Sequence, residues 1–236
     1  MPHPEEKEPG LLTSTINRLR SRRFAYLTMS LVLLIIAYPY LEVNIPGQVL
    51  MTVITILVMV SLIVAVSDSK RNIIIALCLA VPWFVTLVIN FPLFEAERGI
   101  VIRKEIVFAV LLFLFTTITI FLHLLKSREV TSEILFASVC VYLLIGLTWA
   151  SLYIFIDFVY PNSFIDTSDQ IAINAPRFLF FSYITLTTVG YGTMIPISDP
   201  ARSLALLEAI IGQLYLAILV ARLVGLHISK PKAPDA

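Results

Sequence analysis

Charged residues and cysteines are both scarce in this sequence of 236 residues, and each shortage excludes a class of protein. Only 14% of the residues are charged whereas 58% are hydrophobic, which is not the composition of an ordinary soluble domain. The net charge of +1 gives no indication of binding to nucleic acid. The two cysteines, Cys78 and Cys140, lie within apolar runs, where we expect small packing side chains rather than a disulfide or a metal site.

Long apolar segments account for most of the chain. Six of them have about the 17 to 25 residues that a helix needs to cross the hydrocarbon core. They are Phe24–Leu41, Gln48–Val66, Asn72–Leu93, Ile106–Leu125, Ile134–Asp157 and Ser203–Leu226. The first has no small-residue cleavage site after it, so we interpret it as a retained helix and not a signal peptide. The predicted fold is an all-α membrane protein with six transmembrane helices.

The basic residues indicate the orientation of this fold. If the amino terminus is cytoplasmic, 12 of the 17 Lys and Arg residues lie in regions on the cytoplasmic side. Cytoplasmic loops carry an excess of Lys and Arg, so we expect both termini to be cytoplasmic in a multi-pass protein of the cell membrane.

A seventh apolar segment, Ala175–Leu186, is too short to cross the membrane. It predicts a re-entrant helix between the fifth and sixth spans, with Asn174 as its N-cap and Pro176 in its first turn. Residues 187–192 follow directly and read Thr-Thr-Val-Gly-Tyr-Gly. Non-helical backbone at membrane depth is tolerated where it is buried or lines a cavity, so this run is expected to line a pathway.

Residues 188–192 have the Thr-Val-Gly-Tyr-Gly sequence from which potassium filters are built, in which backbone carbonyls replace the water shell of the ion. The glycines let successive carbonyls point the same way, which a Cβ atom resists. Taken alone, the pentapeptide also fits a glycine-rich turn between two helices. We expect potassium, as the permeant ion and not as a cofactor, to bind at Thr188, Val189, Gly190 and Tyr191, with Gly192 framing the site.

With its flanking helices, this motif makes residues 134–226 resemble the pore module of the potassium-channel superfamily. The whole chain resembles prokaryotic six-helix potassium channels whose pore belongs to the small ion-channel family. Because four filters assemble around one axis in that superfamily and this chain carries one, the resemblance implies a homotetramer in the lipid bilayer of a prokaryotic plasma membrane. We expect Thr187, Phe181, Thr193 and Glu208 to support the pore helix and the filter.

The sequence departs from the family pattern at three places around the filter. Thr193 stands where the family usually carries Asp, and Ile184 stands where some members bury a carboxylate. Phe180 and Phe181 replace an aromatic pair that can form a hydrogen bond to the filter, so Tyr191 loses a candidate partner. The outer surround of the filter is therefore predicted to be more apolar than usual and less stable against slow closure.

Two residues of the last span are candidates for gating. Gly212 costs about 1 kcal/mol of helix stability relative to alanine, which indicates either close packing or a hinge. Glu208 lies one turn earlier and is a functional candidate as an ionisable residue inside a span. A hydrogen bond behind the pore helix, to a threonine, is the interpretation that we favour for it. Helical spacing also predicts four residues that face the inner cavity: Gln213, Leu216, Val220 and Val224.

The fourth span, Ile106–Leu125, contains no Lys or Arg, so strong voltage gating is not expected. Arg98, Arg103 and Lys104 precede it and are predicted to lie in an outer loop. About ten residues follow the last span, so no covalent ligand-sensing domain is expected. The predicted organisation is a tail (1–23), a four-helix domain resembling an uncharged sensor domain (24–133), the pore module (134–226) and a short tail (227–236).

The sequence thus favours a passive potassium-selective channel. A weakly selective cation channel and a non-conducting membrane subunit are the alternatives. A membrane-embedded enzyme would need a cluster of ionisable residues at matching depth in several spans, and the first four spans contain no such cluster. Enzymatic activity is therefore not expected.

Overall fold

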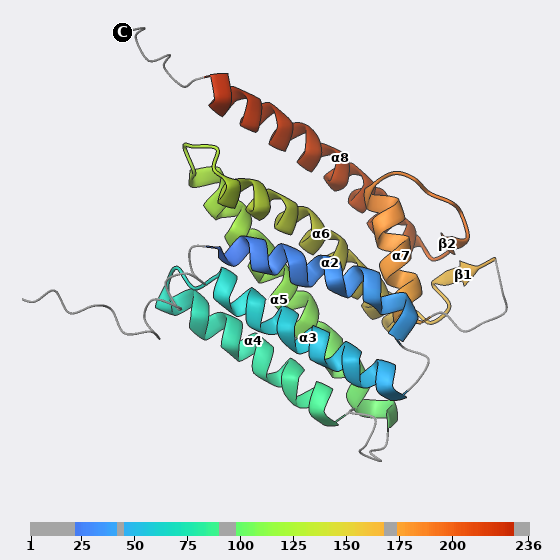
Figure 1. Ribbon diagram of the computed structural model, residues 1–236. Coiled ribbons are helices and arrows are strands. Elements are labelled where there is room, and N and C mark those ends of the chain that lie inside the picture. The colour runs from blue at the N-terminus through green and yellow to red at the C-terminus, as the bar shows by residue number, and fades with distance from the viewer. Residues whose placement is uncertain (1–21, 42–44, 90–97, 168–173, 229–236) are drawn as a thin grey trace, which may run out of the picture.

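Six long helices, one short helix and two short strands make up the described chain. The computed structural model describes residues 22–41, 45–89, 98–167 and 174–228. In chain order the elements are α2 (Arg23–Leu41), α3 (Ile45–Ala65), α4 (Lys70–Ile89), α5 (Arg98–Lys126), α6 (Ser132–Val159), β1 (Phe164–Asp166), α7 (Ala175–Leu186), β2 (Met194–Pro196) and α8 (Asp199–Ile228). The long helices lie side by side, and α7 lies between the ends of α6 and α8 (Figure 1). Residues 1–21 and 229–236, which hold most of the two predicted tails, lie outside the described residues.

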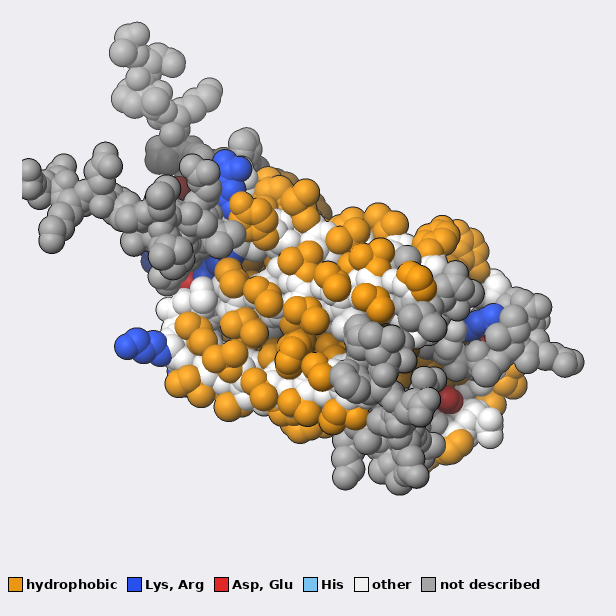
Figure 2. Space-filling view, turned by 60° about the horizontal axis from the view of Figure 1, so that its bottom comes forward, with side chains coloured by type: hydrophobic (Ala, Val, Ile, Leu, Met, Phe, Trp, Pro, Cys, Tyr) orange, Lys and Arg blue, Asp and Glu red, His pale blue; other side chains and the backbone are white. Residues whose placement is uncertain are grey.

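Each of the six long helices overlaps one of the six predicted segments. Five of them, α3, α4, α5, α6 and α8, are long and apolar enough to cross a membrane. The apolar part of α2, Arg23–Tyr38, is shorter, so a sixth crossing stays a prediction. Hydrophobic side chains cover the middle of the face seen in Figure 2, and the visible Lys and Arg side chains lie towards its two ends. Together these features indicate a multi-pass membrane protein.

The helix α5 is longer than predicted. It begins at Arg98, so Arg103 and Lys104 lie in its first turns and not in an outer loop. The prediction was wrong because hydropathy marks the start of the apolar window at Ile106, whereas Lys, Arg and Glu are good helix formers that extend the same helix beyond it. The apolar window itself, Ile106–Lys126, carries no Lys or Arg before Lys126.

The all-α prediction also missed a small sheet. The strands β1 and β2 pair antiparallel, with Phe164 opposite Pro196 and Asp166 opposite Met194. Each strand has three residues, which is too short for the alternation that reveals strands in a sequence. The pairing joins the segment that precedes α7 to the segment that follows residues 187–193.

The four-helix domain, formed by α2, α3, α4 and α5, packs against α6 of the same chain. Both α2 and α5 run along α6, and residues 127–131 connect α5 to α6. Thr131 caps α6 by accepting a hydrogen bond from the Ile134 amide. A connection of this length spans roughly 18 Å at full extension, which keeps the end of α5 near the start of α6.

An ion pair lies at one end of the four-helix domain. Arg23, at the start of α2, donates to both carboxylate oxygens of Asp68, which lies between α3 and α4. His123, near the end of α5, lies 3.5 Å from the same carboxylate. The helix α8 ends at this side of the molecule as well (Figure 1). The amino-terminal end of α2 and the carboxyl-terminal end of α8 therefore share one side, as an even number of crossings requires.

A contact between α2 and α6 gives a direct test of this packing. The Thr28 hydroxyl lies 3.1 Å from the Cys140 sulfur. We expect a Thr28→Cys variant, in a Cys78→Ser background, to form a disulfide within one chain on oxidation, because the two side chains are already in contact. Non-reducing denaturing electrophoresis should show monomers without free thiols. Covalent dimers would mean that α2 packs against α6 of another chain, and the Cys78→Ser variant alone is the control.

Candidate ion-conduction site

The short helix α7 begins and ends where the sequence predicts. It runs from Ala175 to Leu186, with Asn174 in an extended conformation before it and Thr187 as its C-cap. The Asn174 side chain makes no capping hydrogen bond. The backbone carbonyl oxygen of Asn174 accepts from the amides of Arg177 and Phe178 instead. Pro176 occupies the first turn, where its missing N–H group removes no intrahelical bond.

The backbone of the predicted filter alternates in handedness. Thr188, Gly190 and Gly192 have φ values of 59°, 56° and 78°, whereas Val189 and Tyr191 are not in the positive region. Alternation between left- and right-handed conformations turns successive N–H groups to one side, and so turns the carbonyls to the other. A left-handed threonine is strained, costing of the order of 1–3 kcal/mol, and such strain clusters at functional sites.

Hydrogen bonds hold this strained segment at both ends. The carbonyl oxygen of Ile184, inside α7, accepts from the amides of Val189 at 2.8 Å and Gly190 at 3.1 Å. After the segment, the Thr193 carbonyl oxygen accepts from the amide and the hydroxyl of Thr167, at 2.8 and 3.0 Å. Thr187 donates its hydroxyl to the Tyr183 carbonyl at 2.6 Å. The segment is therefore held by hydrogen bonds to α7 on one side and next to the β1–β2 sheet on the other.

All six residues from 187 to 192 are exposed on the protomer. Tyr191 is 71% exposed and Val189 is 53% exposed. The Tyr191 ring stacks on Phe180 of α7, with centroids 6.1 Å apart and an angle of 4° between the planes. Where the family pattern would place a hydrogen bond, this chain has a stacked ring pair.

Phe181 supports α7 from the opposite side. It is buried, and its ring lies edge-on to Tyr153 of α6 and Phe164 of β1, with centroid distances of 5.1 and 5.5 Å. Phe178 contacts Phe164 in the same way. This aromatic cluster fixes α7 against α6 and the small sheet.

Glu208 is fully buried, and its carboxyl group joins three helices. Tyr153 of α6 donates to one carboxyl oxygen at 2.5 Å, and the Ser182 hydroxyl of α7 lies 2.5 Å from the other. The predicted hydrogen bond behind the short helix is present, but its partners are a serine and a tyrosine and not a threonine. Ile184, as expected, presents no carboxylate, and a carboxyl group from α8 lies behind α7 instead.

Two glycines allow α7 to approach its neighbours closely. A Cβ atom on Gly212 would lie 2.8 Å from the Leu186 Cδ1 atom and closer still to the Leu186 carbonyl oxygen. A Cβ atom on Gly146 of α6 would lie 2.5 Å from the Cε1 atom of the Tyr183 ring. Close packing therefore accounts for Gly212, and α8 continues as one helix through it. A hinge at Gly212 stays a prediction.

The acidic residues near the segment differ in their surroundings. Asp166 forms an ion pair with Arg177, which removes it as a free charge. The Asp199 side chain is 98% exposed and lies 3.9 Å from Arg202. Asp169 lies outside the described residues. Of the two described acids, Asp199 is the one that presents its charge to solvent.

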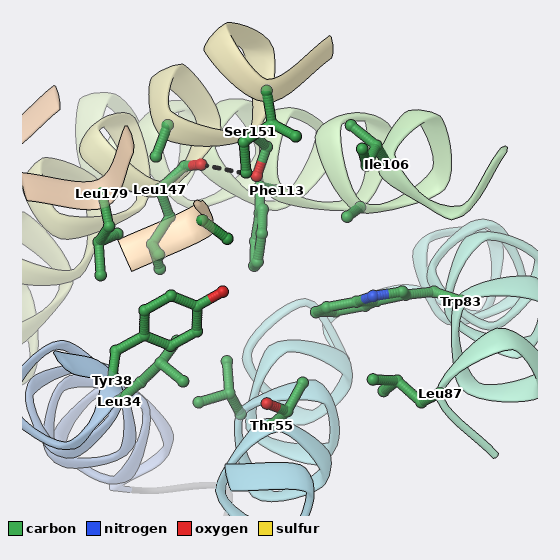
Figure 3. Close-up of a pocket in the computed structure, with 15 residues that line it drawn as sticks. Leu34, Tyr38, Thr55, Trp83, Leu87, Ile106, Phe113, Leu147, Ser151 and Leu179 are labelled. Carbon is green, nitrogen blue, oxygen red and sulfur yellow. Dashed lines mark hydrogen bonds between the residues drawn. The ribbon is translucent and has the colours of Figure 1, made fainter. Parts of the chain in front are cut away.

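A cavity of about 290 Å³ separates the four-helix domain from α7. Tyr38, Trp83 and Phe113 point into it from α2, α4 and α5, and Leu179 of α7 lies on its opposite side (Figure 3). The Ser151 hydroxyl in its wall donates to Leu147 of its own helix, so this group needs no partner in the cavity. The cavity is lined by the four-helix domain, α6 and α7, and α2, α6 and α8 all contact α7 directly.

Sequence reasoning missed several residues of this region. Ser182, Tyr153 and Gly146 lie on other helices than Glu208 or Gly212, and nothing in the local sequence marks them as partners. The signal that was available is the polar serine within the apolar segment Ala175–Leu186, since a hydroxyl at membrane depth needs a hydrogen-bond partner.

One protein-family model matches the part of the chain that contains this site. Residues 129–227 match the family model described as an ion channel. The match contains α6, α7, the filter segment and nearly all of α8, and it covers less than half of the chain. Comparisons with curated proteins and with solved structures found no match. The family match and the membrane-spanning helices together support an ion channel.

The contact at Gly212 predicts a large effect for a small change. Gly212→Ala should lower the thermal midpoint of the purified protein, because overpacking against a backbone carbonyl costs about 1–3 kcal/mol. Gly225→Ala is the matched control on the same helix, since its Cβ atom would meet nothing within 4 Å. Thermal unfolding followed by size-exclusion chromatography measures both variants. Equal midpoints would contradict the packing role.

Proposed function

We propose that this protein is a passive potassium-selective channel, in which residues 188–192 of four identical chains form the filter. The observation that carries the proposal is the alternating backbone at Thr188, Gly190 and Gly192, in a Thr-Val-Gly-Tyr-Gly segment within an ion-channel match. Carbonyls on one side of such a segment suit a dehydrated cation, because they replace its hydration shell.

The exposure of the filter segment supports an assembly of several chains. Residues 187–192 are exposed on a single protomer, although membrane-spanning helices lie before and after them in the chain. Lipid cannot satisfy free carbonyl groups, whereas four filters facing one axis can share a file of ions. The homotetramer is therefore the assembly that we propose.

The exposed face of α8 supports a pathway below the filter. Gln213, Leu216, Val220 and Val224 are all exposed on the protomer. An amide side chain exposed to lipid is costly, so Gln213 suits a water-filled cavity. We propose that this face of α8 lines the inner pathway.

The four-helix domain is proposed to be a scaffold rather than a voltage sensor. The apolar window of α5 has no Lys or Arg before its last residue. It therefore lacks the row of positive charges on which the membrane potential acts in a voltage sensor. We propose both termini on the cytoplasmic side of a prokaryotic plasma membrane, from the distribution of basic residues and the resemblance.

A weakly selective cation channel is the second candidate, and the observation behind it is the stacking of Tyr191 on Phe180. A stacked pair fixes the ring less strictly than a hydrogen bond does. The reversal potential across a planar bilayer, with potassium on one side and sodium on the other, separates the candidates. A value near the potassium equilibrium potential supports the proposal, and a value near zero with clear current supports the second candidate. No current from assembled protein, reconstituted over a range of lipids and voltages, would favour the non-conducting subunit.

Substitution of Gly190 tests the filter itself. Gly190→Ala should abolish potassium flux while leaving assembly intact, because alanine resists a φ of 56° by about 1–2 kcal/mol although its Cβ atom meets no neighbour within the chain. Flux into liposomes and size-exclusion chromatography measure the two effects, with Gly225→Ala as the control. Normal selective flux in Gly190→Ala would remove the filter assignment.

A further inference from the structure

The oxygens around Glu208 form a chain that requires a particular number of hydrogens. Tyr153 donates to one carboxyl oxygen, and Ser182 lies 2.5 Å from the other. The Ser182 oxygen also lies 2.7 Å from the carbonyl oxygen of Gly146 on α6. The chain therefore contains three short contacts between oxygens, running from Tyr153 through Glu208 and Ser182 to Gly146.

Each of these three contacts needs its own hydrogen. The tyrosine and serine hydroxyls supply one each, and the Gly146 carbonyl supplies none because it can only accept. An ionised Glu208 adds no hydrogen, so one contact would bring two lone pairs together at 2.7 Å or less. One serine hydrogen shared between two acceptors does not suit contacts at the short end of the O–H···O range.

A neutral Glu208 supplies the third hydrogen. The acid then donates to Ser182, Ser182 donates to Gly146, and Tyr153 donates to the carbonyl oxygen of the acid. We propose that Glu208 is a carboxylic acid in the folded protein at neutral pH, and that as a hydrogen-bond donor it is the residue that positions the short helix α7 against α6.

The complete burial of Glu208 favours this neutral form. The titratable groups near it are tyrosines: Tyr153 of α6 donates to it, and Tyr142 of α6 and Tyr183 of α7 lie within electrostatic range. The neighbouring strand β2 contributes only Met, Ile and Pro. Among the described residues no cation forms an ion pair with Glu208, and a buried carboxylate without a partner cation costs several kcal/mol.

The chain lies close to the strained segment. Ser182 is two residues before Ile184, whose carbonyl oxygen holds the amides of Val189 and Gly190. A shift of α7 at Ser182 therefore moves the backbone atoms on which residues 189 and 190 are fixed. In this respect the inference rests on the proposed channel function.

The direction of the pH dependence follows from the hydrogen count. The acid form makes all three hydrogen bonds, so positioning is complete at neutral and lower pH. Loss of the proton at alkaline pH removes the bond to Ser182 and places a charge in an apolar site. We expect flux to fall as the pH rises, by about tenfold per pH unit once Glu208 has titrated.

The first experiment is infrared difference spectroscopy of the purified full-length protein, since it does not depend on conduction. At neutral pH, the wild-type spectrum minus that of Glu208→Gln should show the carbonyl band of a neutral carboxyl group. Tyr153→Phe should move this band to higher frequency, because it removes the hydrogen bond to the carbonyl oxygen. Absence of the band, or its presence in Glu208→Gln, would overturn the proposal even if the protein conducts potassium.

The second experiment measures the pH profile of potassium flux in liposomes. Glu208→Gln keeps one donor and one acceptor, so it should conduct at neutral pH and lose the alkaline decline. Ser182→Ala should lower flux and thermal midpoint at neutral pH, whereas Ser151→Ala, whose hydroxyl bonds only within α6, is the matched control. An alkaline decline unchanged in Glu208→Gln would refute the positioning role while leaving the channel function intact.

Discussion

The backbone of residues 187–192 imposes the constraint on which the rest of this structure depends. It is neither helix nor strand, yet it lies between membrane-spanning helices, where unsatisfied polar groups are costly. Four of its amides are satisfied by carbonyl oxygens of α7, and two of these four bind the carbonyl oxygen of Ile184. The remaining exposed groups have to find partners outside the protomer. Cations and further copies of the chain meet that requirement, which is why the geometry of one protomer already favours a channel.

A strained segment persists only where its surroundings fix it, and here the fixing is done from behind by α7. That short helix is held by close contacts at Gly146 and Gly212, by an aromatic cluster around Phe181 and by the carboxyl group of Glu208. Each contact comes from a different part of the chain. In this protein the buried carboxyl group behind the helix is carried by α8, and the backbone carbonyl of Ile184 accepts hydrogen bonds from the amides of Val189 and Gly190.

The four-helix domain relates to the pore module mainly through α6. The short connection between α5 and α6 joins the four-helix domain to α6. An apolar cavity is lined by this domain, α6 and α7. The domain has no Lys or Arg in the apolar window of α5 before Lys126. It does increase the apolar surface that anchors the outer helix in lipid, which is a sufficient physical reason for its packing.

The sequence by itself determined the apolar cores of the long helices, the bounds of α7 and the location of the non-helical segment 187–192, because these depend on local properties: apolar length, a Pro near a helix start, and glycines at alternate positions. It also indicated that Glu208 forms a hydrogen bond behind α7. Only the tertiary structure decided the partners, Ser182 and Tyr153, because residues 26 and 55 positions away in the chain meet there through helix packing. The β1–β2 pairing and the contact of Gly212 with Leu186 could not be predicted from the sequence for the same reason. Each is a contact between distant segments, and neither segment has a sequence pattern that indicates its partner.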